Sequence, residues 1–215
     1  MDGASQDDTA KVIERNRDRL SMVISEPDQG IYDAMNKGLA LARGEVVGFL
    51  NADDFYPEPD VLEAVVSTFD DPAVDACYGD LRYVYSGDPS RTVRYWKSGT
   101  YARARFYHGW MPPHPAFFVR RRILKAHGGF NTALGSAADY ELMLRLLVKH
   151  GIPTTYIPRV IVHMRTGGIS NASIGNRLRA NRMDRLAWRV NGLRPYPWTL
   201  LAKPLRKLGQ WVVRS

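Results

Sequence analysis

The chain has 215 residues and lacks the features that mark secreted, metal-clustered and membrane-spanning proteins. Cys77 is the single cysteine, so an internal disulfide is excluded, and one thiol with five scattered histidines excludes a Cys/His metal cluster. The first eleven residues are polar, without the apolar core of a signal peptide, and no run approaches the roughly 20 apolar residues of a membrane span. These absences predict a cytosolic protein without an export signal or a transmembrane helix.

Most of the chain also lacks an excess of charge. Residues 1–174 carry 20 basic and 21 acidic side chains, whereas residues 175–215 carry 10 basic and 1 acidic, so the net charge of +8 belongs to the tail. A body of balanced charge offers no general footprint for a phosphate backbone, which predicts that nucleic acid is not a partner. The hydrophobic content of 45% is that of one ordinary globular domain.

Short apolar runs alternate with helical patterns along the body, which predicts an α/β fold with a parallel-type sheet. Residues 86–113 show no sustained period and predict an excursion between two halves of one domain. Strands are expected at 22–24, 46–50, 74–78, 82–85, 116–119, 154–157 and 160–163, and helices from about Asp7 and over 31–42, 61–69, 121–127 and 137–150.

A polar turn, Asn51-Ala52-Asp53-Asp54, follows directly on the apolar run that ends at Leu50. The carboxyl end of a central strand is where open α/β sheets bind ligands, and two adjacent carboxylates suit a hard divalent cation. The alternative is a polar turn that only leads into the next helix, since Asp is frequent in turns. From these residues alone, both interpretations stay open.

A polar loop precedes the helix predicted over 31–42. Asp28 and Gly30 suit the start of that helix without any further function. Asp33 and Lys37 have the i, i+4 spacing of an ion pair on a helix surface. Asp33, Asn36 and Lys37 also lie within about one helical turn, which favours contacts with a phosphate or a sugar as the second interpretation.

Three segments together resemble the family 2 glycosyltransferases of the GT-A fold. They match a DGGSTDGT-like turn, an SEPDxGIYDAMNKG segment and an FLNxDD turn of that family, and here they are Asp2–Thr9, Glu26–Gly38 and Phe49–Asp54. The resemblance covers roughly residues 2–170. It implies a GT-A-like, Rossmann-like mixed sheet flanked by helices over 1–174, with a basic helical tail over 175–215.

The resemblance also predicts that the chain is truncated relative to the family. Sheets of this kind normally open with a buried strand, whereas this chain opens with Asp2-Gly3-Ala4-Ser5 and a helix from about Asp7. The family's first strand, its first helix and part of its nucleotide pocket are therefore expected to be missing. One alternative function follows, in which the chain is an inactive glycosyltransferase fragment or a binding module.

Similar enzymes bind a nucleotide-diphosphate sugar, usually with Mg²⁺ or Mn²⁺, and transfer the sugar with inversion. The resemblance implies that Asp53 and Asp54 hold the metal, that Asp53 also contacts the donor, and that Asn51 contacts the donor in place of the first acid of the usual DxD. Asp2 matches the acid of the nucleotide-binding turn. The alternative class is a nucleotidyltransferase, which also uses nucleotide-sugar pockets with paired acids.

The catalytic base of the family lies at an acid-bearing helix start, commonly Glu-Asp, which Ala138-Asp139-Tyr140-Glu141 resembles. Asp139 takes the base position and Ala138 replaces the Glu. An acceptor hydroxyl must lose its proton as it attacks the anomeric carbon, and a positioned carboxylate can take that proton. The alternative is that Asp139 only caps the helix N-terminus, and Glu141 is the reserve candidate for the base.

Two histidines stand beside these segments. By resemblance, His114 in Pro-Pro-His-Pro lies near the substrate and His163 can face the metal. Either one can instead be a core histidine satisfied by the backbone.

The tail interleaves arginines with apolar residues and carries Trp188, Trp198 and Trp211. A basic stretch with interfacial tryptophans predicts a helix lying on an anionic membrane surface. Packing on the domain and nucleic-acid contact are the alternatives. The predicted protein is thus an inverting glycosyltransferase, cytoplasmic and peripheral at the inner face of the membrane, that moves a sugar to a lipid-linked or polysaccharide acceptor for the cell surface.

Overall fold

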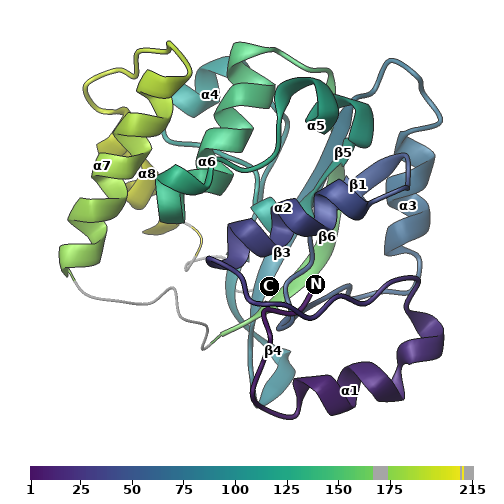
Figure 1. The fold of residues 1–215 in the computed structure, drawn as a ribbon. Coiled ribbons are helices and arrows are strands. Elements are labelled where there is room, and N and C mark those ends of the chain that lie inside the picture. Colours follow the sequence, from purple (N-terminus) through teal and green to yellow (C-terminus); the bar gives the residue numbers. More distant parts are fainter. Residues whose placement is uncertain (167–173, 209, 211–215) are drawn as a thin grey trace.

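The computed structural model describes residues 1–166, 174–208 and 210, without the side chains of 174–180, 207 and 208 (Figure 1). A six-stranded sheet with the order β1-β5-β3-β6-β2 forms its centre, and β4 pairs with the outer half of β3. The strands are β1 (Val46–Gly48), β2 (Asp54–Phe55), β3 (Ala76–Tyr85), β4 (Asp88–Trp96), β5 (Phe117–Arg120) and β6 (Thr154–Arg165).

The sheet is mixed, which confirms the fold implied by the family resemblance. Only β3 and β6 run parallel, while the other pairs are antiparallel. The expectation of a parallel-type sheet is therefore wrong in detail. The physical reason for the antiparallel pairs lies in the 86–113 segment. This segment brings the chain back along β3 as β4, and β5 then enters the sheet antiparallel to β3.

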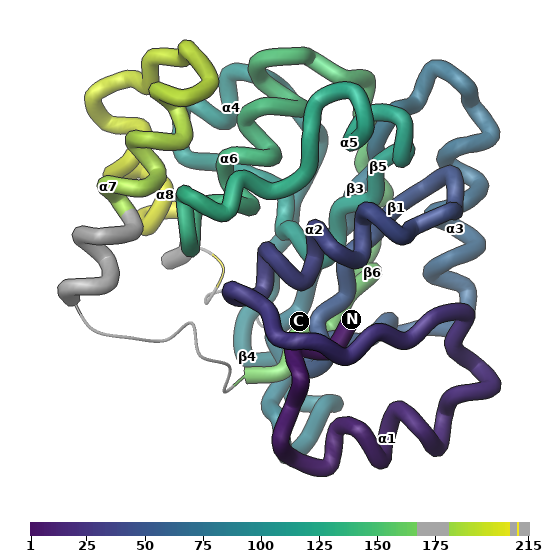
Figure 2. Tube along the Cα trace, viewed as in Figure 1, coloured from purple at the N-terminus to yellow at the C-terminus, as the bar shows by residue number. Residues whose placement is uncertain are grey.

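Helices cover both faces of the sheet (Figure 2). Val61 and Val65 of α3 pack on one face with Leu81 and Ile161, whereas α6 and its π-helical continuation over Leu144–Lys149 pack on the other. The helices are α1 (Thr9–Arg15), α2 (Ile31–Leu41), α3 (Val61–Thr68), α4 (Arg103–Tyr107), α5 (Arg121–His127), α6 (Ala138–Met143), α7 (Ile174–Val190) and α8 (Thr199–Leu208).

The strand predicted at 22–24 does not form, because only Ser25 makes an isolated bridge with Asp2. The two strands predicted at 154–157 and 160–163 are one strand, β6, which bulges around Pro158 where its register against β3 shifts. Gly79 faces this bulge. A Cβ there would lie 2.6 Å from the Ile161 side chain, so only glycine permits the close approach of β3 and β6.

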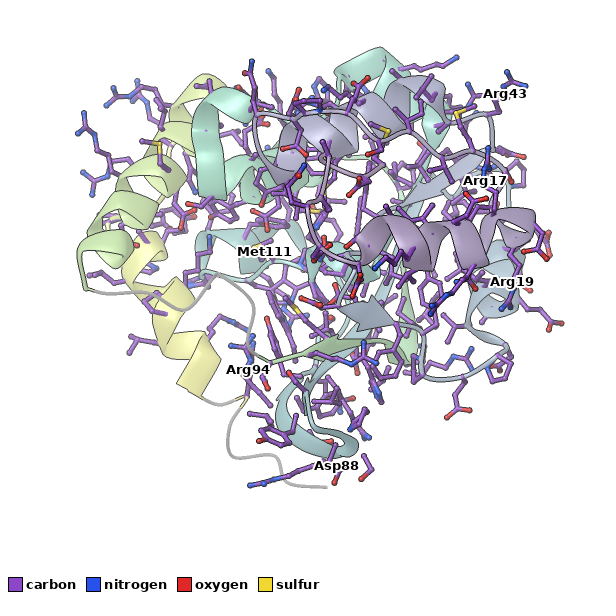
Figure 3. The ribbon with its side chains drawn as sticks, turned by 60° about the horizontal axis from the view of Figure 1, so that its bottom comes forward. Arg17, Arg19, Arg43, Asp88, Arg94 and Met111 are labelled. Atoms are coloured by element: carbon purple, nitrogen blue, oxygen red, sulfur yellow. The ribbon has the colours of Figure 1, made fainter. Side chains whose placement is uncertain are left out.

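The hairpin of β3 and β4 was not predicted, because its contacts are paired polar and aromatic side chains rather than a periodic apolar face. The Arg94 guanidinium lies 3.8 Å from the Tyr83 ring centre, and that of Arg82 lies 5.4 Å from the Tyr95 ring centre. The hairpin extends from the sheet towards its tip near Asp88 (Figure 3).

A buried carboxylate fixes the base of this hairpin. Asp80 is 1% exposed and accepts hydrogen bonds from the Tyr95 hydroxyl, from the Tyr156 hydroxyl at 2.8 Å and from the Ser98 amide at 2.8 Å. Burial and the neighbouring Asp80 raise the pKa of Tyr156 to about 12, so its hydroxyl keeps the proton that it donates.

We expect Asp80→Asn to lower the free energy of unfolding by about 2 kcal/mol, because the amide has no charge and replaces one accepting oxygen with an NH2 group, which weakens the bonds from the three donors. Tyr95→Phe removes one of the three donors and should cost about half as much. Urea denaturation of the two variants provides the measurement. A loss for Asp80→Asn below that of Tyr95→Phe would contradict the anchoring role.

The basic tail joins the fold through its two helices. The Trp188 side chain is fully buried, and its Nε1 donates to the Tyr140 hydroxyl at 2.9 Å. Lys203 of α8 reaches Asp184 of α7 at 2.8 Å. The prediction that Trp188 is interfacial is therefore wrong, because this ring fills the core beside α6. Trp198 is half exposed, and Trp211 lies outside the described residues. No described helix is long and apolar enough to cross a bilayer.

Candidate active site

The first element of the site is the turn that begins at Asp2. The Asp2 carboxylate accepts hydrogen bonds from the Ser5 and Ser25 hydroxyls, each at 2.5 Å. These bonds, that from Ser25 first, lower the pKa of Asp2. A Cβ on Gly3 would lie 2.3 Å from an Asp28 carboxylate oxygen, so glycine lets the turn approach the loop before α2. Two polar segments more than twenty residues apart thus meet in one place.

The α2 residues predicted to contact the substrate, Asp33 and Lys37, bind the protein's own loop before α2 instead. Lys37 Nζ lies 2.9 Å from a Glu26 carboxylate oxygen and 3.5 Å from one of Asp33, and Glu26 is the main cause that raises the pKa of Lys37. Asp33 also accepts a bond from the Gln29 amide at 3.0 Å. The helix-surface ion pair of the alternative interpretation is therefore present, and it fixes the loop above the Asp2 turn.

Asn36 links α2 to the loop that follows α5. Its amide nitrogen donates to the Phe130 carbonyl at 2.9 Å, and its amide oxygen accepts from the Phe130 amide at 2.8 Å. This reciprocal pair gives Asn36 a structural role at the Phe130 turn.

The Asn51–Asp54 turn follows β1 and leads into β2, whose first residue is Asp54. Asp54 is 6% exposed, and one of its carboxylate oxygens accepts from the Asn51 amide at 2.7 Å. Burial raises the pKa of Asp54. The Asp53 carboxylate is exposed beside it, while its carbonyl accepts from Arg165 at 3.2 Å.

The oxygen atoms of this turn suit a divalent metal. Asp54 Oδ1 and Asn51 Oδ1 are buried acceptors with no hydrogen-bond partner among the described residues, and Asp53 adds an exposed carboxylate. Hard cations such as Mg²⁺ and Mn²⁺ take ligands of this kind. No three His, Cys, Asp or Glu side chains of the described chain gather closely enough to hold a metal alone, so substrate phosphates and water would complete its coordination.

His163 does not lie with the Asp54 carboxylate. In the pairing of β2 with β6, His163 stands opposite Phe55, whereas Asp54 stands opposite Met164. Neighbouring residues of a strand point to opposite faces, which separates the imidazole from the Asp54 side chain. The His163 ring packs edge-on against Phe55 at 5.3 Å, and burial lowers its pKa.

Asp139 is the second residue of α6 and is half buried, with its carboxylate accepting a hydrogen bond from the Tyr140 amide at 2.7 Å. The Tyr32 phenol of α2 lies beside it: burial first, and then the Asp139 charge, raise the pKa of Tyr32. The reserve candidate, Glu141, is 3% exposed and forms an ion pair with Arg145 at 2.9 Å. Of the two acids, only Asp139 is accessible.

His114 stands in an aromatic cluster next to Asp139. Its ring lies 5.8 Å from Phe49 and 5.3 Å from Phe130, and Phe130 in turn contacts Tyr32 at 5.2 Å. His114 Nε2 is buried without a hydrogen-bond partner in the described part of the chain. Burial lowers the pKa of His114 while Asp139 opposes the shift, so the imidazole is neutral near pH 7.

Tyr83 of β3 connects the two acidic positions. Burial is the main cause that raises its pKa, and the charges of both Asp54 and Asp139 contribute in the same direction. The charges of the turn after β1 and of the start of α6 therefore both act on the Tyr83 phenol. The sequence reasoning missed Tyr32 and Tyr83. Tyr32 lies inside the segment that resembles the family, whereas nothing near Tyr83 pointed to the site.

A mixed α/β sheet flanked by helices, with a paired-acid turn after β1, is the arrangement expected of a glycosyltransferase of the GT-A fold. Residues 1–128 match the family described as Glycosyl transferase family 2, and the chain belongs to that family. It is 29% identical over 179 residues to a PGL/p-HBAD biosynthesis glycosyltransferase of Mycobacterium tuberculosis, a match that covers 81% of this chain and 67% of the relative.

Solved structures share the fold at lower sequence identity. Residues 1–349 of TarS of S. aureus, in complex with UDP-GlcNAc, superpose with a TM-score of 0.65 at 18% identity, over 88% of this chain and 55% of that 349-residue segment. The mannosyltransferase PcManGT of Pyrobaculum calidifontis, in complex with GDP-Man and Mn²⁺, superposes with a TM-score of 0.59 at 18% identity, over 100% of this chain and 65% of the other. The chain thus spans a little over half to two thirds of the length of these two matched structures.

Proposed function

We propose that this chain is an inverting glycosyltransferase that moves a sugar from a nucleotide-diphosphate donor to a lipid-linked or polysaccharide acceptor in cell-surface glycan synthesis. The observation that carries the proposal is the Asn51–Asp54 turn, with buried side-chain oxygens that have no partner among the described residues, in a chain that belongs to the family 2 glycosyltransferases. A metal-binding acid and a base must flank the anomeric carbon from opposite sides for inversion. The nucleotide sugars named for TarS and PcManGT support a donor of this class.

The donor side of the proposed site consists of the Asp2 turn and the Asn51–Asp54 turn. Asp2, whose carboxylate is held by Ser5 and Ser25, would contact the nucleoside. Asp53, Asp54 and the Asn51 side-chain oxygen would hold Mg²⁺ or Mn²⁺, which when bound neutralises charge on the diphosphate. Asp33 and Lys37 contribute by keeping the loop between these turns in place.

The acceptor side consists of Asp139 and its neighbours. The Asp139 carboxylate takes the proton of the acceptor hydroxyl while that oxygen bonds to the anomeric carbon, and the bond from this carbon to the diphosphate oxygen breaks. The nucleoside diphosphate leaves with the electron pair. The neutral His114 imidazole, with its unpartnered Nε2, is available for a hydroxyl of the sugar or the acceptor.

Metal-dependent nucleotide binding is the first test of the proposal. We expect calorimetry with uridine and guanosine diphosphates to show binding that weakens about 10-fold or more without Mn²⁺. Because burial raises the pKa of Asp54, a proton competes with the metal as the pH falls. Affinity should therefore decrease on acidification at a pH above the ordinary range of an Asp, and recover as the pH rises.

Asp53→Ala and Asp54→Ala should abolish the metal effect, while Asp70→Ala, which removes an exposed acid at the end of α3, should leave it unchanged. Nucleotide binding that needs no metal and survives both substitutions would contradict this site. The product then distinguishes the enzyme classes: free nucleoside diphosphate indicates glycosyl transfer, and pyrophosphate indicates nucleotidyl transfer. Release of neither supports an inactive fragment or a binding module.

The lipid-linked acceptor and a location at the inner, cytoplasmic face of the membrane belong to the same proposal. Support comes from the tail, where Trp198, Leu201 and Leu205 are exposed. Apolar side chains at this spacing share one face of a helix, as in helices that lie in a membrane interface.

A further inference from the structure

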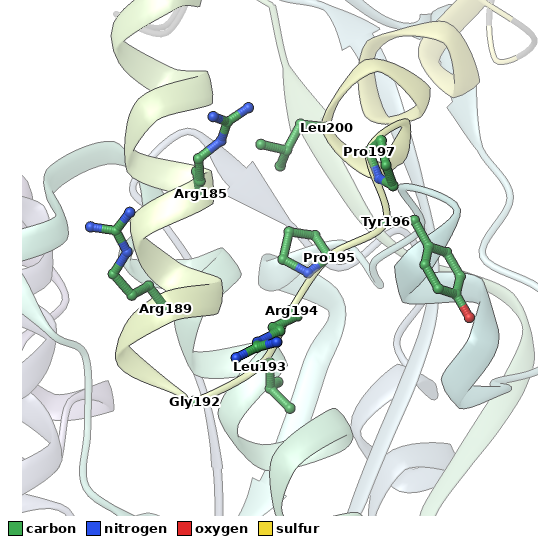
Figure 4. Close-up of a pocket in the computed structure, with 9 residues that line it drawn as sticks. All are labelled: Arg185, Arg189, Gly192, Leu193, Arg194, Pro195, Tyr196, Pro197 and Leu200. Atoms are coloured by element: carbon green, nitrogen blue, oxygen red, sulfur yellow. The ribbon is translucent and has the colours of Figure 1, made fainter.

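A cavity of about 540 Å³ lies between α7 and the loop that joins it to α8. Arg185 and Arg189 come from successive turns of α7, and Arg194 comes from the loop (Figure 4). The remaining lining residues are Gly192, Leu193, Pro195, Tyr196, Pro197 and Leu200.

The three guanidinium groups have no counter-charge in the described part of the chain. None of them forms an ion pair or a side-chain hydrogen bond there, and all three residues are exposed. Asp184, the one acidic residue of the tail, pairs with Lys203 instead. Three positive charges therefore line a cavity large enough for a phosphate-bearing group.

An exposed apolar face continues from the rim of this cavity. The Tyr196 ring, which lines the cavity, contacts the Trp198 ring at 5.0 Å. Leu201 and Leu205 follow at i+3 and i+7 from Trp198, and each is 64% exposed. Leu200, by contrast, turns inward and is buried. The outer face of α8 thus presents a tryptophan and two leucines beside an arginine-lined cavity.

We propose that the cavity binds the phosphate of an anionic phospholipid headgroup while Trp198, Leu201 and Leu205 enter the acyl-chain boundary. Guanidinium groups match phosphate oxygens with paired hydrogen bonds. Apolar side chains beside them gain free energy only where a hydrocarbon layer lies next to the phosphate, and the backbone of a nucleic acid offers none. This inference rests on the membrane contact of the proposed function and not on glycosyl transfer.

Vesicle binding tests the proposal with the full chain. We expect cosedimentation with phosphatidylcholine vesicles that contain phosphatidylglycerol and little with phosphatidylcholine alone. Arg185→Gln with Arg189→Gln should weaken partitioning by a factor on the order of 10, since each basic residue at an anionic surface contributes measurably. The control, Arg19→Gln with Arg43→Gln, removes two exposed charges at the other end of the molecule and should change it less than threefold (Figure 3).

Charge-preserving variants separate a headgroup site from diffuse attraction. Arg185→Lys with Arg189→Lys keeps both charges but loses the planar fork, so we expect at least a threefold loss and weaker competition by glycerol phosphate. Leu201→Ser with Leu205→Ser should remove the binding that persists in high salt. Equal binding by the Lys variant, or an intact chain that ignores the anionic vesicles at low salt, would overturn the inference.

Two further measurements complete the test. Single-stranded RNA that binds the intact chain and loses affinity with the same arginine variants would assign the cavity to nucleic acid and overturn the proposal. Nucleotide binding by calorimetry should be unchanged in every tail variant. If the intact chain binds nucleotide but not vesicles, the membrane site is wrong and the glycosyltransferase site is unaffected. If it binds vesicles but not nucleotide, the glycosyltransferase site is wrong and the membrane site is unaffected.

Discussion

Asp139→Asn should reduce turnover by a factor on the order of 10² or more while leaving donor affinity nearly unchanged. The substitution keeps the shape of the side chain and its oxygen towards the Tyr140 amide, but the amide cannot take a proton from the acceptor hydroxyl. The measurement is a nucleoside-diphosphate release assay with a saturating donor, combined with calorimetry of donor binding and a thermal melt.

Glu141→Gln is the matched control, two residues along the same helix. Glu141 is buried and holds Arg145 and Asn191, so its substitution should lower the melting temperature rather than act on the chemical step. If Asp139→Asn and Glu141→Gln lose stability and turnover to the same degree, Asp139 is only a helix-capping residue. Unchanged turnover in Asp139→Asn would exclude it as the base.

Trp188→Ala should lower the free energy of unfolding by about 3–5 kcal/mol, because it empties a fully buried ring position and removes the hydrogen bond to Tyr140. Because a domain of this size is only marginally stable, such a loss is a large part of its total free energy of unfolding. Denaturant titration of the full chain, followed by far-UV circular dichroism, gives the value.

Trp198→Ala provides the comparison, since that ring is half exposed. It should cost less than about 1 kcal/mol of stability and instead weaken vesicle binding. Equal small effects of both substitutions on stability would show that α7 is an appendage on the domain rather than part of its core. Comparison of the two variants thus distinguishes a tryptophan that packs in the core from one that contacts the membrane.

Much of this protein was predictable because the informative residues are close together in the sequence. The Glu26–Gly38 and Phe49–Asp54 segments indicate the family by their residues alone, and the family and the mixed α/β fold are confirmed. Helices α2 and α3 and strand β1 follow from local periodicity and turn residues, whose physical basis lies within a few residues. The assignment of Asp53, Asp54 and Asp139 to the chemistry remains a prediction.

The predictions that were missed or wrong concern elements whose contacts lie with residues far away in the chain. Strand β4 has no apolar alternation, and its stability comes from pairing with β3 and from the three donors to Asp80. Whether a tryptophan of the tail is interfacial or buried depends on whether Tyr140 and α6 are placed to cover it, which no pattern inside the tail records.

The sequence by itself determined the class of protein, the candidate acids and the charge division between body and tail, since these are properties of contiguous residues. Only the tertiary structure decided that Asn36 binds the Phe130 backbone and that His163 stands opposite Phe55, on the other face of the strand from Asp54. The physical reason is that strand register and helix packing assign each side chain its neighbours, and both are set by the whole core rather than by any one segment.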